Sequence, residues 1–356
     1  MTKTYLVTGG AGFIGSNFVS LLLKQKDDIR VINVDALTYA GNMDNLESVL
    51  GDKRHVFIKA DICDKSAISE VFQKCDIDYV VNFAAESHVD RSIRSPEVFV
   101  STNICGTANL LQCAMDAWDL GNGGFKVGVR FLQVSTDEVY GTLPLEDSSA
   151  LFREETPLDP HSPYSASKAS ADMLVKAFGD TFELPVNITR CSNNYGPNQF
   201  PEKLIPLMID NAVNHDELPV YGDGLNVRDW LYVEDHCRAI DLVLTSGRVG
   251  EIYNIGGNNE RANIAIVKTI IAECSEICAD PLISERLITF VADRKGHDRR
   301  YGIDSSKIQK ELGWKPKVAF EEGIKETIRW YLGHRDWVER IKNGSYRAAF
   351  VEMMPK

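Results

Sequence analysis

The chain has 356 residues, a formal net charge of −12 at pH 7 and a pI near 5.1. This length can bury a large core in one domain or in two intertwined ones. The acidic surplus argues against nucleic acid and anionic membranes as general partners, so an anionic substrate would need a local basic site. No signal-peptide pattern begins the chain and no apolar run approaches the ~18 residues of a membrane span, so we expect a soluble, cytoplasmic protein.

The eight cysteines include no C-x-x-C pair and lie mostly in apolar contexts. We interpret them as reduced core residues. Cys274 and Cys278 lie one helical turn apart, but without nearby histidines they indicate packing rather than zinc binding. His88 and His297 likewise have no converging ligand set, so we expect no metal site.

The first predicted element is an apolar strand over residues 5–7, which runs into a glycine-rich loop and a helix over 14–24. Gly9, Gly12 and Gly15 have the spacing GxxGxxG. Glycine at these positions permits a tight turn and close approach of backbone to a pyrophosphate, and the helix presents free N–H groups to the anion. The context therefore predicts a dinucleotide site.

A second strand over residues 30–34 ends in Asp35. An acidic residue about 20 positions beyond the glycines can bond an adenosine ribose diol and would repel a 2′-phosphate, which favours NAD over NADP. The alternative is an ordinary strand-end or turn carboxylate.

Strand and helix patterns continue to alternate, which predicts parallel pairing through right-handed crossovers. The strand candidates are residues 5–7, 30–34, 55–59, 79–83, 129–134, 186–190 and 252–255. Two long helices, 98–118 and 165–182, are apolar on more than one face. This favours a homodimer packed through them, although burial within one large monomer would also account for the pattern.

Two short sequence motifs support the catalytic hypothesis. Thr136-Asp137-Glu138 follows a buried strand, so a hydroxyl and two carboxyls emerge where ligands bind in a doubly wound sheet. Tyr164 and Lys168 lie four residues apart, so on a helix they share a face and the cation can favour the phenolate. The alternatives are a solvated pair of charges and an ordinary amphipathic helix.

After residue 190, prolines at 197, 201, 206 and 219 interrupt the alternation and predict a loop-rich, substrate-binding insertion. The fold class is therefore α/β, a Rossmann-type doubly wound parallel sheet with a smaller, interleaved C-terminal substrate-binding α/β domain. We assign residues 1–191 and 226–257 to the NAD-binding domain and residues 192–225 and 258–356 to the substrate domain, with helices expected over 262–276 and 320–332.

Several motifs resemble those of the dTDP-glucose 4,6-dehydratases, a family within the extended short-chain dehydrogenase/reductases, and the resemblance runs nearly end to end. They are residues 8–15, 61–62, 82–90 (NFAAESHVD), 135–141 (STDEVYG), 164–168, 192–197 (SNNYGP), 228–235 (RDWLYVED) and 293–301 (DRKGHDRRY). Lys295 departs from the family pattern, which usually has proline there.

The resemblance implies a lyase that oxidises C4 of the sugar, eliminates water across C5 and C6 and returns the hydride to C6, leaving NAD unchanged. Tyr164 would be the base at C4, Lys168 would lower its pKa and hold the nicotinamide ribose, and Thr136 would bond the same sugar oxygen. Glu138 would remove the C5 proton, and protonated Asp137 would deliver a proton to the departing C6 hydroxyl. The product would feed deoxysugar synthesis, dTDP-L-rhamnose first among the candidates.

The resemblance also implies the binding residues. The NAD contacts, besides the three glycines, would be Phe13, Ile14, Asp35, Asp61, Ile62, Ala84, Ala85, Ser87, Thr102, Tyr164, Lys168 and Asn194. The nucleotide-sugar contacts would be Ser87, Thr136, Asn193, Glu202, Lys203, Leu204, Tyr221, Arg228, Asn263, Arg294, His297 and Tyr346. Arg228 is suited to a diphosphate because guanidinium groups bond phosphates in bidentate fashion, although it could instead pair with Asp229 or Asp235.

Two other functions stay open. A 4-epimerase of the same group would need the glycine loop and Tyr164 but neither carboxyl of the triplet. A noncatalytic NAD-binding sensor or scaffold would need no convergence of the catalytic groups.

Overall fold

The computed structural model describes residues 2–347, and its centre is a seven-stranded parallel sheet. The strand order is β10-β6-β5-β4-β1-β2-β3. Their bounds are β1 Lys3–Thr8, β2 Ile29–Asp35, β3 His55–Lys59, β4 Tyr79–Asn82, β5 Arg130–Thr136, β6 Val186–Cys191 and β10 Ile252–Ile255. Each predicted strand is present within two residues of its expected ends, and the doubly wound α/β class is confirmed.

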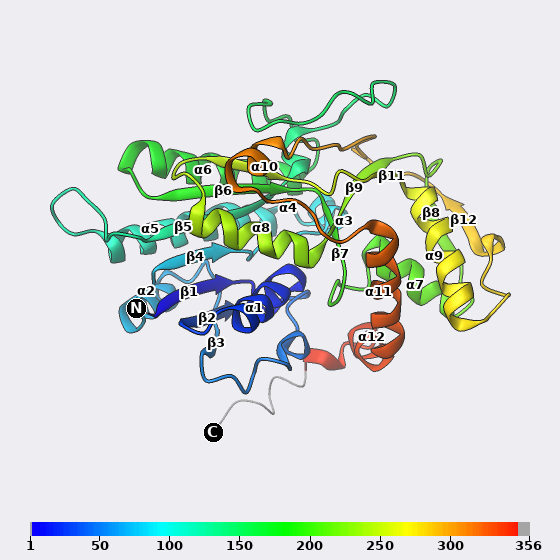
Figure 1. The fold of residues 1–356 in the computed structure, drawn as a ribbon, viewed down its shortest axis with the longest axis horizontal. Helices are drawn as coiled ribbons and strands as arrows, with labels where there is room; N and C mark the ends of the chain where they lie inside the picture. Colours follow the sequence, from blue (N-terminus) through cyan, green and yellow to red (C-terminus); the bar gives the residue numbers. More distant parts are fainter. Residues whose placement is uncertain (1, 348–356) are drawn as a thin grey trace.

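Helices cover both faces of this sheet (Figure 1). One face carries α1 Phe13–Gln25 and α8 Val233–Ser246, and the other carries α2 Lys65–Lys74, α5 Thr107–Trp118 and α6 Pro163–Phe182. The alternation along β1 explains the two cores, since Tyr5 and Val7 pack on the first face and Leu6 on the second.

The helix expected over 98–118 is not one regular α-helix. Short helices α3 Val89–Arg94 and α4 Pro96–Phe99 lead into a π-helix at Val100–Gly106, which continues as α5. Val98 and Val100 are 42% and 49% exposed, and on α6 Met173 is 59% exposed. Apolar side chains therefore remain uncovered on the two helices for which dimerisation was predicted.

A second unit lies beside the carboxyl ends of the main strands and has a core of its own. It contains α7 Leu204–Val213, α9 Asn263–Cys278, α11 Phe320–Gly333 and α12 Arg335–Lys342, with a parallel pair of β8 Leu218–Tyr221 and β12 Ile288–Val291. A three-stranded sheet, β11-β9-β7, connects it to the main unit; its strands are β11 Glu260–Ala262, β9 Val227–Tyr232 and β7 Asn193–Tyr195.

This second unit is more regular than the prolines suggested. Pro206 is the third residue of α7, where a missing N–H costs no helical hydrogen bond, and Pro219 lies in β8, which has a partner on one side only. The helix α10 Ser306–Leu312 falls in the sequence range assigned to the substrate domain, yet it packs on β10 and α8 of the main unit.

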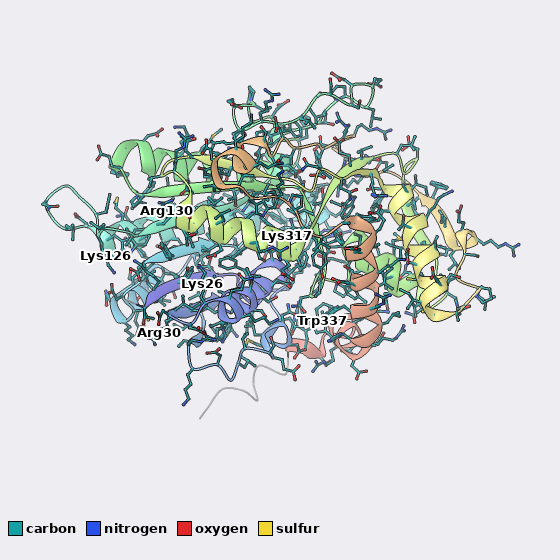
Figure 2. All side chains as sticks on the ribbon, viewed as in Figure 1. Lys26, Arg30, Lys126, Arg130, Lys317 and Trp337 are labelled. Carbon is teal, nitrogen blue, oxygen red and sulfur yellow. The ribbon has the colours of Figure 1, made fainter. Side chains whose placement is uncertain are left out.

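One contact ties the second unit to the glycine-rich loop. Trp337 of α12, labelled in Figure 2, donates its indole N–H to Asn45 Oδ1 at 2.9 Å, and Asn45 donates to the backbone oxygen of Ala11 at 2.9 Å. The two units are thereby held together beside the predicted dinucleotide loop. Within residues 2–347, no helix is long and apolar enough to cross a membrane.

Candidate active site

A cavity of about 310 Å³ opens at the carboxyl ends of the main strands. It lies where the strand order reverses between β1 and β4, the position at which doubly wound sheets bind ligands. All fifteen residues predicted to contact NAD line it, and so do the five predicted catalytic residues, two of which belong to both sets, together with Asn193 and Lys203.

The glycine-rich loop is shaped by three close approaches. A Cβ on Gly9, which has φ +70°, would lie 2.7 Å from the Ala84 nitrogen, and a Cβ on Gly15 would lie 2.3 Å from the Gly9 oxygen. A Cβ on Gly12, which lines the cavity, would meet only the Gly9 oxygen, at 3.3 Å. The backbone can therefore approach a pyrophosphate at the start of α1, whose first turn carries no acidic residue.

Asp35 ends β2 and has both of its carboxylate oxygens held by backbone. Oδ2 accepts from Ala11 N at 2.9 Å and Oδ1 accepts from Leu37 N at 2.8 Å. Burial raises the pKa of Asp35, and these two N–H groups act in the opposite direction. The carboxyl thus acts as a strand-end brace and also faces the cavity.

The triplet forms a turn in which the two carboxyls have different surroundings. Thr136 ends β5 and caps a 3₁₀ turn, its hydroxyl oxygen accepting from Glu138 N at 3.2 Å and its O–H donating to Asp137 Oδ1 at 3.3 Å. The other oxygen of Asp137 is buried without a hydrogen-bond partner among the described residues. An unpaired buried oxygen favours the neutral acid.

The charges around the two carboxyls also affect their pKa values differently. Burial, followed by the charge of Glu138, raises the pKa of Asp137 well above its usual range. Burial also raises the pKa of Glu138, but Arg294, Arg228 and Lys203 oppose that shift. Burial thus favours the protonated form of both carboxyls, and only at Glu138 do several positive charges oppose this shift.

Tyr164 and Lys168 lie on the first turns of α6, which begins at Pro163 with a capping box between Ser162 and Ser165. Lys168 Nζ donates to the Val134 oxygen at 2.7 Å. Burial, then the charge of Glu138, raises the pKa of Tyr164 well above 10, and burial lowers the pKa of Lys168. The Lys168 ammonium is thus engaged by β5, and the lowering of the phenol pKa by Lys168 stays a prediction.

The predicted substrate residues fall into two groups. Ser87, Thr136, Asn193 and Lys203 line the cavity, and Lys203 Nζ donates to the Ser87 oxygen at 3.1 Å. Glu202 lies outside that lining with Oε1 3.8 Å from His88 Nε2, and Leu204 begins α7 and packs on the second core.

The other group contains two arginines whose charges act on Glu138. Arg228 and Arg294 act on the Glu138 carboxyl, and the Arg228 guanidinium lies 4.1 Å from the centre of the Tyr301 ring. Nearby, the rings of His297 and Tyr221 meet edge to face at 6.2 Å. Asn263 Oδ1 and Arg294 Nε are buried without a hydrogen-bond partner among the described residues, which fits groups awaiting a polar ligand.

The alternative pairing of Arg228 with a neighbouring aspartate is not what the structure shows. Its N–H groups donate to the backbone oxygens of Val227 and Asp298, whereas Asp229 accepts from the backbone of residues 257 and 259. The positive charge of Arg228 is therefore available to bind an anionic ligand.

Tyr346, which was predicted to contact the nucleotide sugar, does not line the cavity. It is 4% exposed, belongs to the second core and donates its O–H to the Tyr39 oxygen at 2.5 Å. It therefore supports the cavity wall from behind and does not face a sugar. Tyr39, which sequence reasoning missed, lines the cavity and packs against Arg91 at 3.8 Å. It lies in an irregular segment, where no periodic pattern could have indicated it.

The described residues contain no group of three or more histidine, cysteine, aspartate or glutamate side chains arranged to hold a metal ion.

Comparisons with known proteins fit this site. A family model described as GDP-mannose 4,6 dehydratase matches residues 6–327. The dTDP-glucose 4,6-dehydratase of Xanthomonas campestris pv. campestris strain B100 is 54% identical over 346 residues, which cover 97% of each chain. The chain belongs to the dTDP-glucose 4,6-dehydratase family. The resemblance stated from the motifs is thereby confirmed.

Solved structures of this family and of its neighbours share the fold. DesIV, a dTDP-glucose 4,6-dehydratase from Streptomyces venezuelae solved with NAD and TYD bound, has a TM-score of 0.86 and 47% identity, covering 95% of this chain and 99% of its own. A UDP-glucose 4-epimerase from Thermotoga maritima has a TM-score of 0.80 and 30% identity, covering 93% and 99%. Since the epimerase shares the architecture, the fold alone does not distinguish dehydration from epimerisation.

Proposed function

We propose that this chain is an NAD-dependent lyase that converts dTDP-glucose to dTDP-4-keto-6-deoxyglucose and water. The observation that carries the proposal is the Asp137–Glu138 pair, two adjacent carboxyls that line the cavity and of which Asp137 has the more strongly raised pKa. The curated relatives of the same name at more than half sequence identity support it.

The residues present fit NAD. The glycine loop leaves room for a pyrophosphate, Asp35 faces the cavity from the end of β2, and Asp61, Ile62 and Thr102 line the same wall. Bound NAD would supply a hydride acceptor for C4, a hydride donor for C6 and a positive charge. The remaining chemistry belongs to the chain's own side chains.

At C4, Tyr164 takes the proton of the sugar hydroxyl while Thr136 bonds the same oxygen. Because burial raises the pKa of Tyr164, its phenolate requires added positive charge, and Lys168 lies one helical turn away. The hydrogen bond from Lys168 to β5 fixes the helix that carries the phenol against the strand that carries the triplet.

At C5 and C6, the two carboxyls of the triplet act in opposite senses. A C4 ketone acidifies the C5 proton, which Glu138 removes while Arg228, Arg294 and Lys203 stabilise the carboxylate form. Asp137 gives its proton to the C6 hydroxyl, which leaves as water, and one carboxyl of the pair returns a proton to C5. Protons taken and given balance within the site.

We assign the diphosphate to Arg228 with Arg294, and the base to the region of Tyr221 and His297, with Asn263 beside them. Glu202 and Lys203 approach the sugar from the start of α7. We keep, as a proposal, the division into an NAD-binding part, residues 1–191 and 226–257, and a substrate-binding part, residues 192–225 and 258–356. Two features depart from it: Arg228 is assigned to the diphosphate, and α10 packs on the main unit. Met1 and residues 348–356 lie outside the described residues.

We further propose a cytoplasmic homodimer in which the exposed apolar side chains of residues 98–118 and 165–182 pack against a second copy. The product is a precursor of 6-deoxysugars, and dTDP-L-rhamnose synthesis is the pathway we favour.

The experiment is mass spectrometry of dTDP-glucose after incubation with the purified protein and NAD. A dehydratase makes a product lighter than the substrate by one water. An isomer of unchanged mass would identify the 4-epimerase instead, and an unaltered substrate, with UDP-, CDP- and GDP-glucose also unaltered, would identify a noncatalytic NAD binder.

A further inference from the structure

A buried arginine that has no part in the steps above, Arg190, connects the helix of Tyr164 and Lys168 to the turn of the triplet. It lies on β6, where it is the register partner of Ser135, the residue before the triplet. Its side chain is 4% exposed. A buried cation is costly unless it is paired and hydrogen-bonded, so its partners show which parts of the site it holds.

On one side, Arg190 is joined to α6. Its Nε donates to Asp172 Oδ2 at 2.9 Å, and the Asp172 side chain is 1% exposed. Asp172 follows Lys168 by four residues and Tyr164 by eight, so the three lie on one face of the helix. A buried ion pair resists separation, because either partner alone would be an uncompensated charge. The helix is therefore fixed to β6 close to its two predicted catalytic residues.

On the other side, Arg190 is joined to the turn of the triplet. Its Nη1 donates to the hydroxyl oxygen of Tyr140 at 3.0 Å, and Tyr140 is the last residue of the 3₁₀ turn Asp137–Tyr140. The same hydroxyl donates to Asn254 Oδ1 of β10 at 2.8 Å. Tyr140 is 3% exposed, so both bonds lie in the protein interior. One hydroxyl thus fixes the end of this turn from two directions.

The apolar contacts of the turn do not supply the same constraint. The Tyr140 ring stacks on Phe152 with their centres 5.0 Å apart, and Val139 and Ala169 belong to the same apolar cluster. Apolar packing is non-directional, whereas a hydrogen bond fixes both a distance and an angle. Loss of the Tyr140 hydroxyl alone would leave the ring packed and would release the turn from β6 and β10.

We propose that Arg190 is a positioning residue that holds the turn of the triplet in place relative to α6, through Tyr140 on one side and Asp172 on the other. This inference rests on the proposed function. Oxidation at C4 uses α6 and Thr136 at the end of β5, whereas elimination uses the two carboxyls inside the turn. A loosened turn should slow elimination far more than oxidation, since a displacement of about 1 Å can cost about 100-fold in rate.

The test is stopped-flow mixing of the NAD-loaded protein with dTDP-glucose, in which formation and decay of reduced nicotinamide give separate rate constants. The variant Tyr140→Phe removes only the hydroxyl. Tyr253→Phe is the matched control, because the hydroxyl of this buried tyrosine also makes two hydrogen bonds, accepting from Arg248 N at 3.0 Å and donating to Glu311 at 2.9 Å. A loss of folded protein lowers both amplitudes but leaves the ratio of the two rate constants unchanged.

In Tyr140→Phe we expect formation within about twofold of wild type and decay at least about tenfold slower, with a wild-type ratio in Tyr253→Phe. Mass spectrometry of the acid-quenched intermediate should show that the sugar still carries its C6 oxygen. Arg190→Lys keeps a charge beside Asp172 but lacks a second, separately placed donor, so it should show the same imbalance. This second variant decides the question if Tyr140→Phe does not fold.

Two results would overturn the positioning role and leave the proposed function standing. One is a wild-type ratio of the two rate constants in the variants. The other is a persistent intermediate that has already lost water, since elimination would then be intact. If wild type itself forms neither reduced nicotinamide nor a lighter product, the proposed function fails and this inference fails with it.

Discussion

The cofactor side and the sugar side of the cavity are each stabilised by contacts, and these contacts span different distances along the sequence. On the cofactor side, Asp35 accepts from Ala11, 24 positions away, and the glycine loop closes on itself. On the sugar side, Lys203 bonds Ser87 across 116 positions and Arg228 bonds Asp298 across 70. The cofactor side is therefore encoded in compact motifs, whereas the sugar side exists only once distant segments have packed.

This difference predicts which variants affect catalysis and which affect substrate binding. Changes to the triplet or to Tyr164 should abolish chemistry with binding intact, and changes on the sugar side should weaken binding with the chemistry intact.

Tyr164→Phe should lower kcat by about 10²–10⁴-fold, because it removes the base for the C4 hydroxyl. Steady-state turnover of dTDP-glucose measures this, and NAD binding by calorimetry checks that the cofactor side is intact. Turnover within a few-fold of wild type would show that another group takes the C4 proton.

We expect kcat to depend on pH through the protonation state of Asp137. Because burial raises its pKa in the folded protein, Asp137 ionises at a higher pH than a free carboxyl, so kcat should fall on the alkaline side, by about tenfold per pH unit beyond that pKa. Circular dichroism at each pH separates this loss from unfolding. A kcat that stays flat until the protein unfolds would contradict the acid role.

Arg228→Lys should raise KM for dTDP-glucose by about tenfold with kcat changed little, since bidentate contact with a phosphate is lost while the charge is kept. Arg248→Lys is the control, because Arg248 makes an exposed bidentate pair with Glu311 at 3.0 and 2.6 Å far from the cavity. If kcat fell and KM did not, Arg228 would act on the chemistry of Glu138 rather than on binding.

Asp35→Asn should weaken NAD binding by up to about tenfold and narrow its preference over NADP, because the negative charge at the end of β2 is lost. Titration calorimetry with each dinucleotide measures both effects. An unchanged ratio of the two affinities would assign Asp35 to bracing the loop alone.

The same contrast explains what the sequence could and could not predict. Strand ends, the glycine loop and the positions of Thr136, Asp137, Glu138, Tyr164 and Lys168 follow from local periodicity and spacing, and all meet in one cavity. The placement of Tyr346 behind Tyr39 and the π-helix at Val100–Gly106 depend on tertiary packing, which leaves no local pattern. The engagement of Lys168 by Val134 could not be foreseen either, because the helical spacing brings it near Tyr164 without fixing its partner.

The central claim is the division of work between Asp137 and Glu138, and Glu138→Gln tests it most directly. In single-turnover mixing of the NAD-loaded variant with dTDP-glucose, we expect reduced nicotinamide to form at close to the wild-type rate and then persist, because oxidation at C4 proceeds while removal of the C5 proton is blocked. The matched Asp137→Asn variant should also oxidise C4 and should still exchange the C5 proton in D₂O. If Glu138→Gln formed the C6-methyl product at the wild-type rate, the assignment of Glu138 as the base would be wrong.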